Sequence, residues 1–258
     1  MSWTVEHHRG GADELHHLGL EAPGRTVLVM ELDHAAVALG STQSDAVLDP
    51  AALRSPGPGR DPRAVTRRHS GGGLVVMNPG EVVWVDVVIP AGDPLWRVDV
   101  GEAFVWLGRV WAEVVAGRLA SVDPPPVVHR GAPRHADLGR AVCFAGVGSG
   151  EVVVGDRKVV GLSQRRTRDW ARFQCLVHGR FDAEDSMSVL APHLTTGGFG
   201  DRLRARLAGG VSQAAALATT LLIRACTLWY GELVGGLALA ALVRKLPPAD
   251  TTREQPKS

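Results

Sequence analysis

Residues 67–76, Arg-Arg-His-Ser-Gly-Gly-Gly-Leu-Val-Val, place three consecutive glycines between a double arginine and an apolar run. Because glycine has no Cβ atom, a ligand can lie against bare backbone N–H groups, and such groups bind anions when they converge. Arg67 and Arg68 add guanidinium groups that can hold a phosphate or a carboxylate in a bidentate way. The stretch is no P-loop, because it lacks GxxxxGK[ST]. Taken alone, it is compatible with an anion-binding loop and also with a flexible turn.

Short apolar runs on both sides of this stretch predict strands. Residues 25–32 (RTVLVMEL) and 35–40 (AAVALG) precede it, and 73–90 contains two further strands around a turn at 78–80. The segment 49–62 is dense in Pro and Gly, so we expect a surface loop there rather than a strand or a helix.

One helix and one hairpin are predicted in the second half of the chain. Apolar side chains recur at helical spacing over 99–119, behind a capping box made by Asp99 and Glu102. Residues 151–164 (EVVVGDRKVVGLSQ) predict a hairpin that turns at Gly155-Asp156.

The remaining segments complete the predicted fold class. A loop is expected over 121–139, a strand over 140–146 (RAVCFAG), and about two helices over 184–245. Paired strands with few helices, in hairpin rather than strict βαβ order, indicate an α+β domain with a mixed, largely antiparallel β-sheet flanked by helices.

Composition excludes several classes of protein. The chain has 258 residues, 45% of them hydrophobic and 21% charged, with a formal net charge of +1, so nothing suggests binding to nucleic acid or to a membrane surface. Three dispersed cysteines and a start without an apolar signal core indicate a cytoplasmic protein with reduced thiols. The most apolar segment, 211–243, is interrupted by Arg224 and Glu232, so buried helices are expected rather than a membrane span.

Lys158 lies on the return strand of the predicted hairpin, in GDRKVVGLSQRR (155–166). A lysine between valines at a sheet edge often only protects that edge from aggregation. A lysine is also suited to neutralising charge that develops on a carbonyl or phosphoryl oxygen in a dry site. The residues alone leave both roles open.

Four arginines follow closely, at positions 165, 166, 168 and 172. They predict either a solvated basic face or a docking site for a triphosphate or an acidic carrier domain. The histidine pairs 7–8 and 16–17 lack convergent partners, so no metal site is predicted.

Three motifs occur in an order that resembles a known catalytic module: VALGSTQ (37–43), RRHSGGG (67–73) and GDRKVVGLSQRR (155–166). They are similar to those of lipoate-protein ligases and octanoyltransferases and, more distantly, biotin-protein ligases. Biotin ligases have alternating Gly and Arg in the loop, so the lipoate and octanoate side is favoured. The resemblance covers about residues 26–182 and implies a biotin/lipoate-ligase-like catalytic domain.

The resemblance implies a chemistry and a set of site residues. In a ligase, lipoate or octanoate attacks the α-phosphate of ATP with the help of Mg²⁺, and the acyl-adenylate then acylates a lysine of a lipoyl carrier domain. Lys158 would be the catalytic lysine, whose charge stabilises both transition states. The residues implied to line the acyl and adenylate pocket are Arg68, Ser70, Gly71, Gly72, Gly73, Val75, Gly161, Ser163 and Gln164.

Cys143 supports an alternative. Its Cys-Phe context resembles octanoyltransferases that hold the acyl group on a cysteine just before the lysine strand, and such an enzyme needs neither ATP nor a metal. A lone cysteine is otherwise a small buried hydrophobe. Met77-Asn78 also stands where the family usually has His-Asp, which would help hold nucleotide or metal. Ligase, transferase and non-catalytic acyl-binding or lipoyl-binding homologue therefore remain as alternatives.

The domain organisation follows from these boundaries. Four segments are expected: a polar, solvated N-terminal segment (1–25), the biotin/lipoate-ligase-like catalytic domain (26–195), a C-terminal helical extension (196–245) and a disordered tail (246–258).

Overall fold

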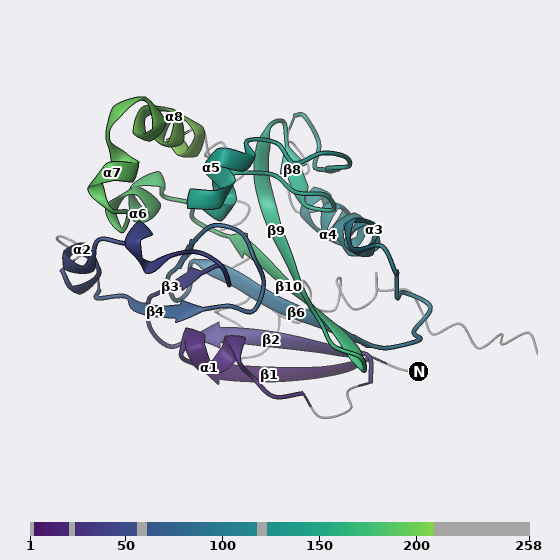
Figure 1. Cartoon of the computed structure of the whole chain (residues 1–258). Coiled ribbons are helices and arrows are strands. Elements are labelled where there is room, and N and C mark those ends of the chain that lie inside the picture. Colours follow the sequence, from purple (N-terminus) through teal and green to yellow (C-terminus); the bar gives the residue numbers. More distant parts are fainter. Residues whose placement is uncertain (1–2, 21–23, 56–60, 118–122, 209–258) are drawn as a thin grey trace, which may run out of the picture.

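Two β-sheets form the centre of the molecule in the computed structural model, which describes residues 3–20, 24–55, 61–117 and 123–208 (Figure 1). The larger sheet has seven strands in the order β1 (Thr4–Gly10), β2 (Thr26–Leu32), β6 (Val82–Pro90), β10 (Trp170–His178), β9 (Arg157–Arg166), β8 (Val152–Val154) and β7 (Val127–Val128). The smaller sheet has the order β4 (Ala64–Arg67), β3 (Ala36–Leu39) and β5 (Val75–Met77). Only β1–β2 and β3–β4 pair in parallel among these strands, which confirms the mixed, largely antiparallel α+β prediction.

Short helices surround the sheets. They are α1 (Ala12–His16), α2 (Pro50–Arg54), α3 (Val100–Ala103), α4 (Val105–Ala116), α5 (Ala136–Ala141), α6 (Ala183–Ser188), α7 (Pro192–Thr195) and α8 (Gly197–Ala208), with the 3₁₀ turns η1 (Asp45–Val47) and η2 (Cys143–Ala145).

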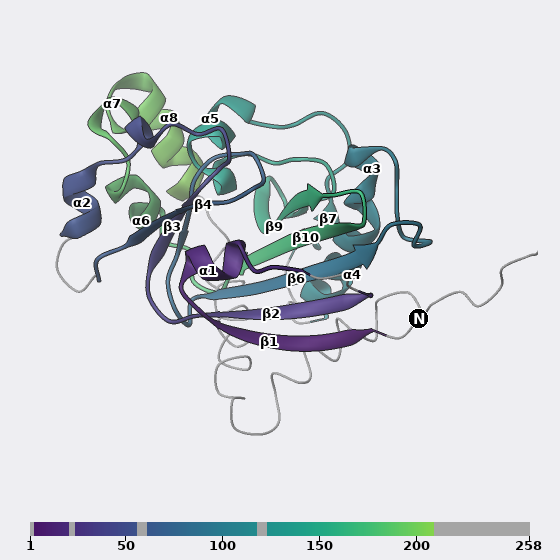
Figure 2. The same ribbon diagram turned by 60° about the horizontal axis from the view of Figure 1, so that its bottom comes forward.

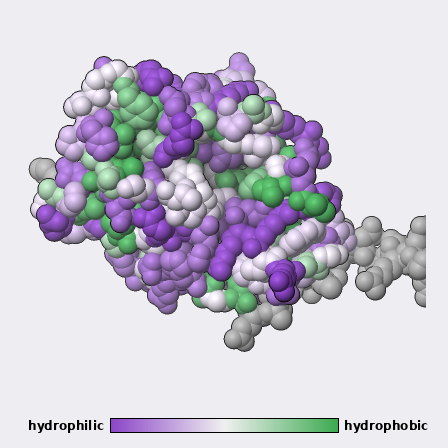
Figure 3. Space-filling view, in the orientation of Figure 1, coloured by the Kyte–Doolittle hydropathy of each residue, from purple (hydrophilic) through white to green (hydrophobic). Residues whose placement is uncertain are grey.

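Strand alternation divides the interior into layers, because successive side chains point to opposite faces of a sheet. Val27 packs with α4 on one face of the large sheet, whereas Leu28 and Met30 pack with α1 and the small sheet on the other. On the far side of the small sheet, Val37 and Leu39 pack with α5, α6 and α8 (Figures 1 and 2). Hydrophilic side chains cover most of the face shown in Figure 3, with smaller apolar areas between them.

Several predicted elements are confirmed. Strands β2, β3, β5 and β6 occupy the predicted runs, and the hairpin of β8 and β9 turns at Gly155, where φ is 58°. Asp99 accepts a hydrogen bond from the Glu102 N–H at 2.9 Å, and the predicted helix follows as α3 and α4, separated at Phe104. The turn at 78–80 joins strands of different sheets rather than a paired hairpin.

The N-terminal segment is only partly solvated. Residues 4–10 form edge strand β1, and the following helix α1 buries Ala12, Leu15 and His16. The strand is exposed along most of its length, so its sequence lacks the apolar alternation by which strands are recognised.

Residues 140–146 are also not a strand. They form the end of α5 and the turn η2, and Val142 makes only an isolated bridge with Leu74. The apolar side chains of this segment are buried although its backbone is not regularly paired with a strand. A short apolar run in the sequence does not distinguish a paired strand from such a buried irregular segment. The expected loops also contain short elements: α2, capped by Asp49 and begun by Pro50, and strand β7 with the start of α5.

The C-terminal predictions are only partly covered. Helix α8 places Leu203 and Leu207 in the same apolar cluster as Leu74 and Val142, and the domain boundary at 195 stays a prediction. The segment 211–243, Cys226 and the tail 246–258 lie outside the described residues. Within the described part, no helix is long and apolar enough to span a membrane.

Candidate active site

A cavity of about 300 Å³ lies between the two sheets, with walls from β3, β5, β6, β9, β10 and the α5–η2 segment. It brings together most of the residues singled out in the sequence. The predicted residues on its lining are Arg68, Gly71, Gly72, Val75, Cys143, Lys158, Gly161 and Ser163. Ser70, Gly73 and Gln164 are not on it.

The glycine loop is built for close backbone packing. A Cβ atom on Gly73 would lie 2.5 Å from the carbonyl oxygen of Gly139 and 2.8 Å from the Val142 nitrogen. The contact continues through Leu74, whose N–H donates to Ala141 at 3.0 Å and whose carbonyl accepts from the Cys143 N–H at 2.9 Å. Gly73 is therefore needed to bring the loop directly against the backbone that carries Cys143.

Arg68 organises the loop from inside. It is 5% exposed, and its guanidinium donates to the hydroxyl of Ser70 and to the carbonyls of Ala38, Gly71 and Gly73 at 2.9 to 3.2 Å. Four of its five donors are thus used within the protein. Arg68 shapes the cavity wall, and Ser70 acts by holding Arg68.

The turn from Gly40 to Gln43, at the end of the first motif, packs against the same segment. The Gln43 side chain accepts a hydrogen bond from the Gly40 N–H and donates to the carbonyls of Arg140 and Ala141 at 3.1 and 3.0 Å. A Cβ atom on Gly40 would overlap the carbonyl oxygen of Gly72. The first two sequence motifs are therefore in direct contact around the segment that leads to Cys143.

A β-bulge turns Lys158 toward the cavity. Val152 pairs with Val160 but Val153 pairs with Lys158, so Val159 is an extra residue in β9. Val159 and Val160 both pack on the α4 side, while Lys158 and Gly161 both line the cavity. Without the extra residue, the two-residue period of a strand would place Lys158 on the same face as Val160.

Lys158, Glu151 and Cys143 form a compact charged group. The Lys158 ammonium is 2.9 Å from one Glu151 carboxylate oxygen and 3.0 Å from the other, and 3.6 Å from the Cys143 sulfur. Glu151 also accepts the N–H groups of Gly148 and Leu162 at 2.6 and 3.2 Å. Burial disfavours the charged lysine, but Cys143 and Glu151 outweigh it and raise the pKa of Lys158 above its usual value. The lysine is therefore held as a cation beside a thiol.

Aromatic rings pack behind this group. The Phe144 ring lies 5.3 Å from the Lys158 ammonium and makes edge contacts with His178. Burial lowers the pKa of His178 to about 4, so this histidine is neutral. A low-dielectric wall of this kind strengthens electrostatic interactions at the lysine.

Two residues of the following strands do not lie where the sequence interpretation placed them. The Gln164 side chain lies on the opposite face of β9 from Ser163, with its oxygen and nitrogen both buried. Arg172 is no part of a basic surface: it is 2% exposed and donates to Asp86 at 2.6 Å. It also donates to the carbonyl of Leu15 at 2.7 Å, which anchors the end of α1.

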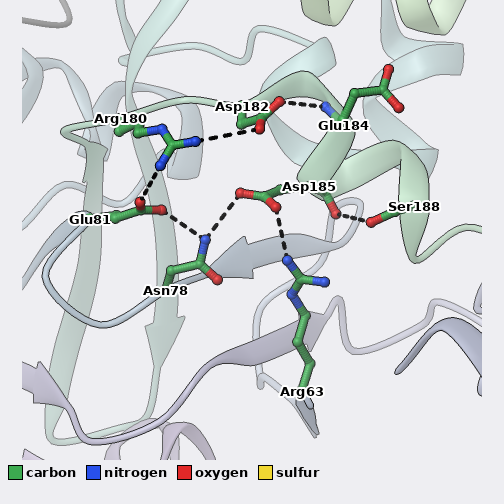
Figure 4. A network of polar contacts seen from close by, with 8 residues as sticks. All are labelled: Arg63, Asn78, Glu81, Arg180, Asp182, Glu184, Asp185 and Ser188. Atoms are coloured by element: carbon green, nitrogen blue, oxygen red, sulfur yellow. Dashed lines mark hydrogen bonds and ion pairs between the residues drawn. The ribbon is translucent and has the colours of Figure 1, made fainter. Parts of the chain in front are cut away.

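Met77 and Asn78, which stand where the family usually has His-Asp, point in different directions. Met77 is buried and lines the cavity. The Asn78 amide points away from it and donates to Glu81 at 2.8 Å and to Asp185 at 3.1 Å, within a network that includes Arg63 (Figure 4).

Sequence reasoning missed two groups of residues at the cavity. Glu151 follows a glycine at the start of the predicted hairpin, and its proximity to Lys158 depends on the hairpin register. His16 and Gln174 also line the cavity, from α1 and β10. Because residues 1–25 are polar, their composition does not indicate that one of them lines a cavity.

The described residues contain no group of three or more His, Cys, Asp or Glu side chains arranged to hold a metal ion. Mg²⁺ is often held by one or two carboxylates together with substrate phosphates. On the cavity lining, the Glu151 carboxylate is already engaged by Lys158. The protein side chains described do not by themselves fit a magnesium site.

Comparison with known proteins gives a family match. Residues 13–197 match the model of the lipoyl protein ligase A/B catalytic domain. No curated protein sequence matches the chain.

Solved structures with a similar fold include three that are described as structures of lipoate-protein ligases. A lipoate-protein ligase A bound with ATP has a TM-score of 0.52 at 16% identity, covering 95% of this chain and 94% of that one. A putative ligase from T. acidophilum with bound lipoic acid scores 0.51 at 16% identity, covering 88% and 95%. The bi-partite ligase of Thermoplasma acidophilum, from a study that includes its E2 lipoyl domain, scores 0.53 at 16% identity, covering 95% and 92%. At this identity the structures show a shared fold.

Proposed function

Because the chain belongs to the lipoyl protein ligase A/B catalytic-domain family, we propose that it is an acyltransferase that moves a lipoyl-type or octanoyl-type acyl group from a thioester to a protein lysine through Cys143. The observation that carries this proposal is the 3.6 Å contact between the Cys143 sulfur and the Lys158 ammonium on the cavity wall. The contact places a thiol, whose deprotonated form is a nucleophile, beside a cation that can stabilise negative charge on a substrate oxygen.

The second free cysteine among the described residues provides an internal contrast. Cys175 is fully buried, and burial raises the pKa of its thiol well above the usual value. Cys143 is only partly buried and lies beside the cation. The environment of Cys143 favours reaction, and that of Cys175 opposes it.

The residues support a two-step transfer. In the first step the Cys143 thiolate attacks the thioester carbonyl, a new C–S bond forms, and the donor leaves as a thiol after taking up a proton. In the second step the acceptor lysine amine attacks the Cys143 thioester, forming an amide and releasing the Cys143 thiol. The Lys158 cation stabilises the negative charge that develops on the carbonyl oxygen in both steps.

An adenylate-forming ligase is the second candidate. It is supported by the ATP-bound ligase with the same fold and by the placement of Lys158 and the glycine loop on one cavity. When bound, ATP would supply the α-phosphate that activates the carboxylate, and the open edge at Gly71 and Gly72 would receive it. Against this candidate, Met77 offers no polar atom suited to a nucleotide and Asn78 is engaged elsewhere.

The acceptor in this proposal is a lipoyl carrier domain, in the cytoplasm. The fold shared with the Thermoplasma ligase, described together with its E2 lipoyl domain, supports this class of partner.

The test is to incubate the protein with octanoyl and lipoyl thioesters of pantetheine and to measure its intact mass. We expect the mass of one acyl group to be added to the wild type and to a Cys175→Ser control, and to be absent from Cys143→Ser. Lys158→Ala should remain folded and lose at least tenfold in the rate of acylation, because it loses the charge beside the sulfur.

The alternatives give different results. Acyl transfer to a lipoyl domain that requires ATP, releases pyrophosphate and survives Cys143→Ser would replace the transferase with the ligase. A wild type that binds the acyl chain but transfers it under neither condition would indicate a non-catalytic homologue.

A further inference from the structure

His16 is a buried polar side chain on the lining of the cavity. It is 6% exposed, and its Nε2 atom has no hydrogen-bond partner within the part of the chain that the structure describes. A buried nitrogen without a partner costs free energy, so a ligand atom that pairs with it gains that free energy on binding.

Neighbouring groups determine which nitrogen of this ring carries the proton. The Gln174 amide nitrogen lies 3.1 Å from Nδ1 of His16 and 3.4 Å from an Asp86 carboxylate oxygen. The Asp86 carboxylate can only accept hydrogen bonds, so the N–H₂ group of Gln174, and not its oxygen, faces both Asp86 and His16. Nδ1 of His16 therefore accepts a hydrogen bond from this N–H₂ group. Burial and the charges of Arg68 and Arg172 lower the pKa of His16 to about 3, so the ring is neutral. The remaining proton is on Nε2, which makes Nε2 a donor.

The ring is also held in place. It packs on Trp84 with the ring centroids 4.4 Å apart, and the Trp84 indole N–H donates to Asp86 at 2.7 Å. Arg172 pairs with the same Asp86 and donates to the main-chain carbonyls of Leu15 and His16. The donor therefore belongs to a rigid network rather than to a mobile side chain.

The donor is far from the reacting group. On β9, Ser163 pairs with Gln174, and Lys158 lies five residues away along the same strand, about 16 Å at the usual rise and less across the bulge at Val159. Between these levels the cavity is lined largely by apolar residues, among them Val75, Met77, Trp84 and Leu176. An acyl chain with its carbonyl at Cys143 would run along these residues toward His16.

We propose that the Nε2–H of His16 recognises a hydrogen-bond acceptor near the distal end of the acyl chain, so that the cavity selects chains with a terminal sulfur or oxygen over plain alkyl chains. The inference rests on the proposed function, because the direction of the chain depends on Cys143. A plain alkyl end would bury the histidine donor unpaired, whereas a ring sulfur or a hydroxyl oxygen would accept its hydrogen bond.

The test compares three pantetheine thioesters of similar length: octanoyl, 8-hydroxyoctanoyl and lipoyl. For the wild type we expect kcat/KM for Cys143 acylation to be about tenfold higher with 8-hydroxyoctanoyl than with octanoyl, as for one buried donor that gains a partner. The lipoyl thioester reports whether a ring sulfur serves as the acceptor. His16→Leu should abolish the preference by losing rate with the functionalised chains and keeping or gaining rate with octanoyl.

His17→Leu is the matched control, because His17 is the next residue, contacts His69 and is not on the cavity lining. It should keep the wild-type ratio. Equal rates for 8-hydroxyoctanoyl and octanoyl in the wild type, or an unchanged ratio in His16→Leu, would overturn the inference.

A binding measurement separates this inference from the proposed function. If no thioester acylates Cys143, the transferase proposal fails, and calorimetry with free 8-hydroxyoctanoate, lipoate and octanoate decides the inference alone. Tighter binding of 8-hydroxyoctanoate than of octanoate that is lost in His16→Leu supports it, and equal binding contradicts it.

Discussion

At the scale of single residues, the candidate site depends on one carboxylate that holds one lysine. Glu151 binds the Lys158 ammonium through both oxygens and is itself fixed by two backbone N–H groups. A buried cation needs such a partner, because burial alone would drive off its proton. Glu151 thus positions Lys158 and keeps it protonated, while Lys158 is the residue that faces the reacting sulfur.

Glu151→Gln tests this relation. The carboxylate is one of the two groups that raise the pKa of Lys158, so its loss lets burial lower that pKa. In the pH profile of Cys143 acylation, the decline in rate at high pH (the alkaline limb) should move to lower pH. The rate should fall about tenfold at pH 9 and by less near pH 6.5. Acylation followed by intact mass from pH 6 to 10 measures this.

Two further variants complete the comparison. Glu151→Asp should restore part of the alkaline limb, and Glu102→Gln, on the short helix α3, should not move it. An alkaline limb at the wild-type pH in Glu151→Gln would show that the carboxylate does not support the charge of Lys158.

At the scale of elements, helix α8 ties the cysteine turn to the lysine hairpin. Arg206 donates from α8 to the carbonyl of Ala145 in η2 at 2.9 Å and to the side chain of Asp156, in the β8–β9 turn, at 2.7 Å. The turn that contains Cys143 and the hairpin that leads to Lys158 therefore share one guanidinium. Arg206 is a positioning residue, since it is not on the cavity lining.

Arg206→Met should lower the rate of Cys143 acylation by roughly ten- to hundredfold, because a small displacement of a reacting group has effects of this size. KM should change little, since the acyl cavity is not touched. Arg204→Met is the control on the same helix, where Arg204 is exposed and pairs with Glu184.

Partial rescue by Arg206→Lys would support a positioning role. A fall in melting temperature with no change in kcat would show that Arg206 only stabilises the fold.

At the scale of the whole molecule, one buried and one half-buried histidine, both neutral in the folded chain, couple stability to pH. His16, the last residue of α1, packs on Trp84 of the large sheet, and His178 lies in the aromatic group behind Lys158. Burial is the main reason that their pKa values fall from 6.5 to about 3 and about 4. Below pH 6.5 the unfolded chain takes up protons that the folded chain refuses, so stability is complete above that pH and is lost as the pH falls toward 4.

The free energy of unfolding should therefore decrease by about 2 kcal/mol for each of these histidines between pH 8 and pH 5. Urea unfolding at a series of pH values measures the slope. His178→Phe should remove about one proton from the slope, and His193→Gln, exposed on α7, should leave it unchanged. A slope that His178→Phe does not alter would mean that His178 titrates normally in the folded state.

The sequence by itself determined the fold class, the core strands and the three motifs that surround the cavity. These follow from local signals: short apolar runs in β2, β3 and β6, the turn at Gly155, and the spacing of glycines, arginines and Lys158. The edge strand β1 and the turn η2 were missed because an exposed strand lacks apolar alternation and a buried irregular turn imitates a strand.

Only the tertiary structure decided which of these residues act together. The bulge at Val159 directs Lys158 into the cavity, and the hairpin register brings Glu151 to it. The anchoring of α1 by Arg172 places His16 at the other end. Each of these arrangements depends on register or on contacts between segments far apart in the chain, and local residue patterns contain no information on either.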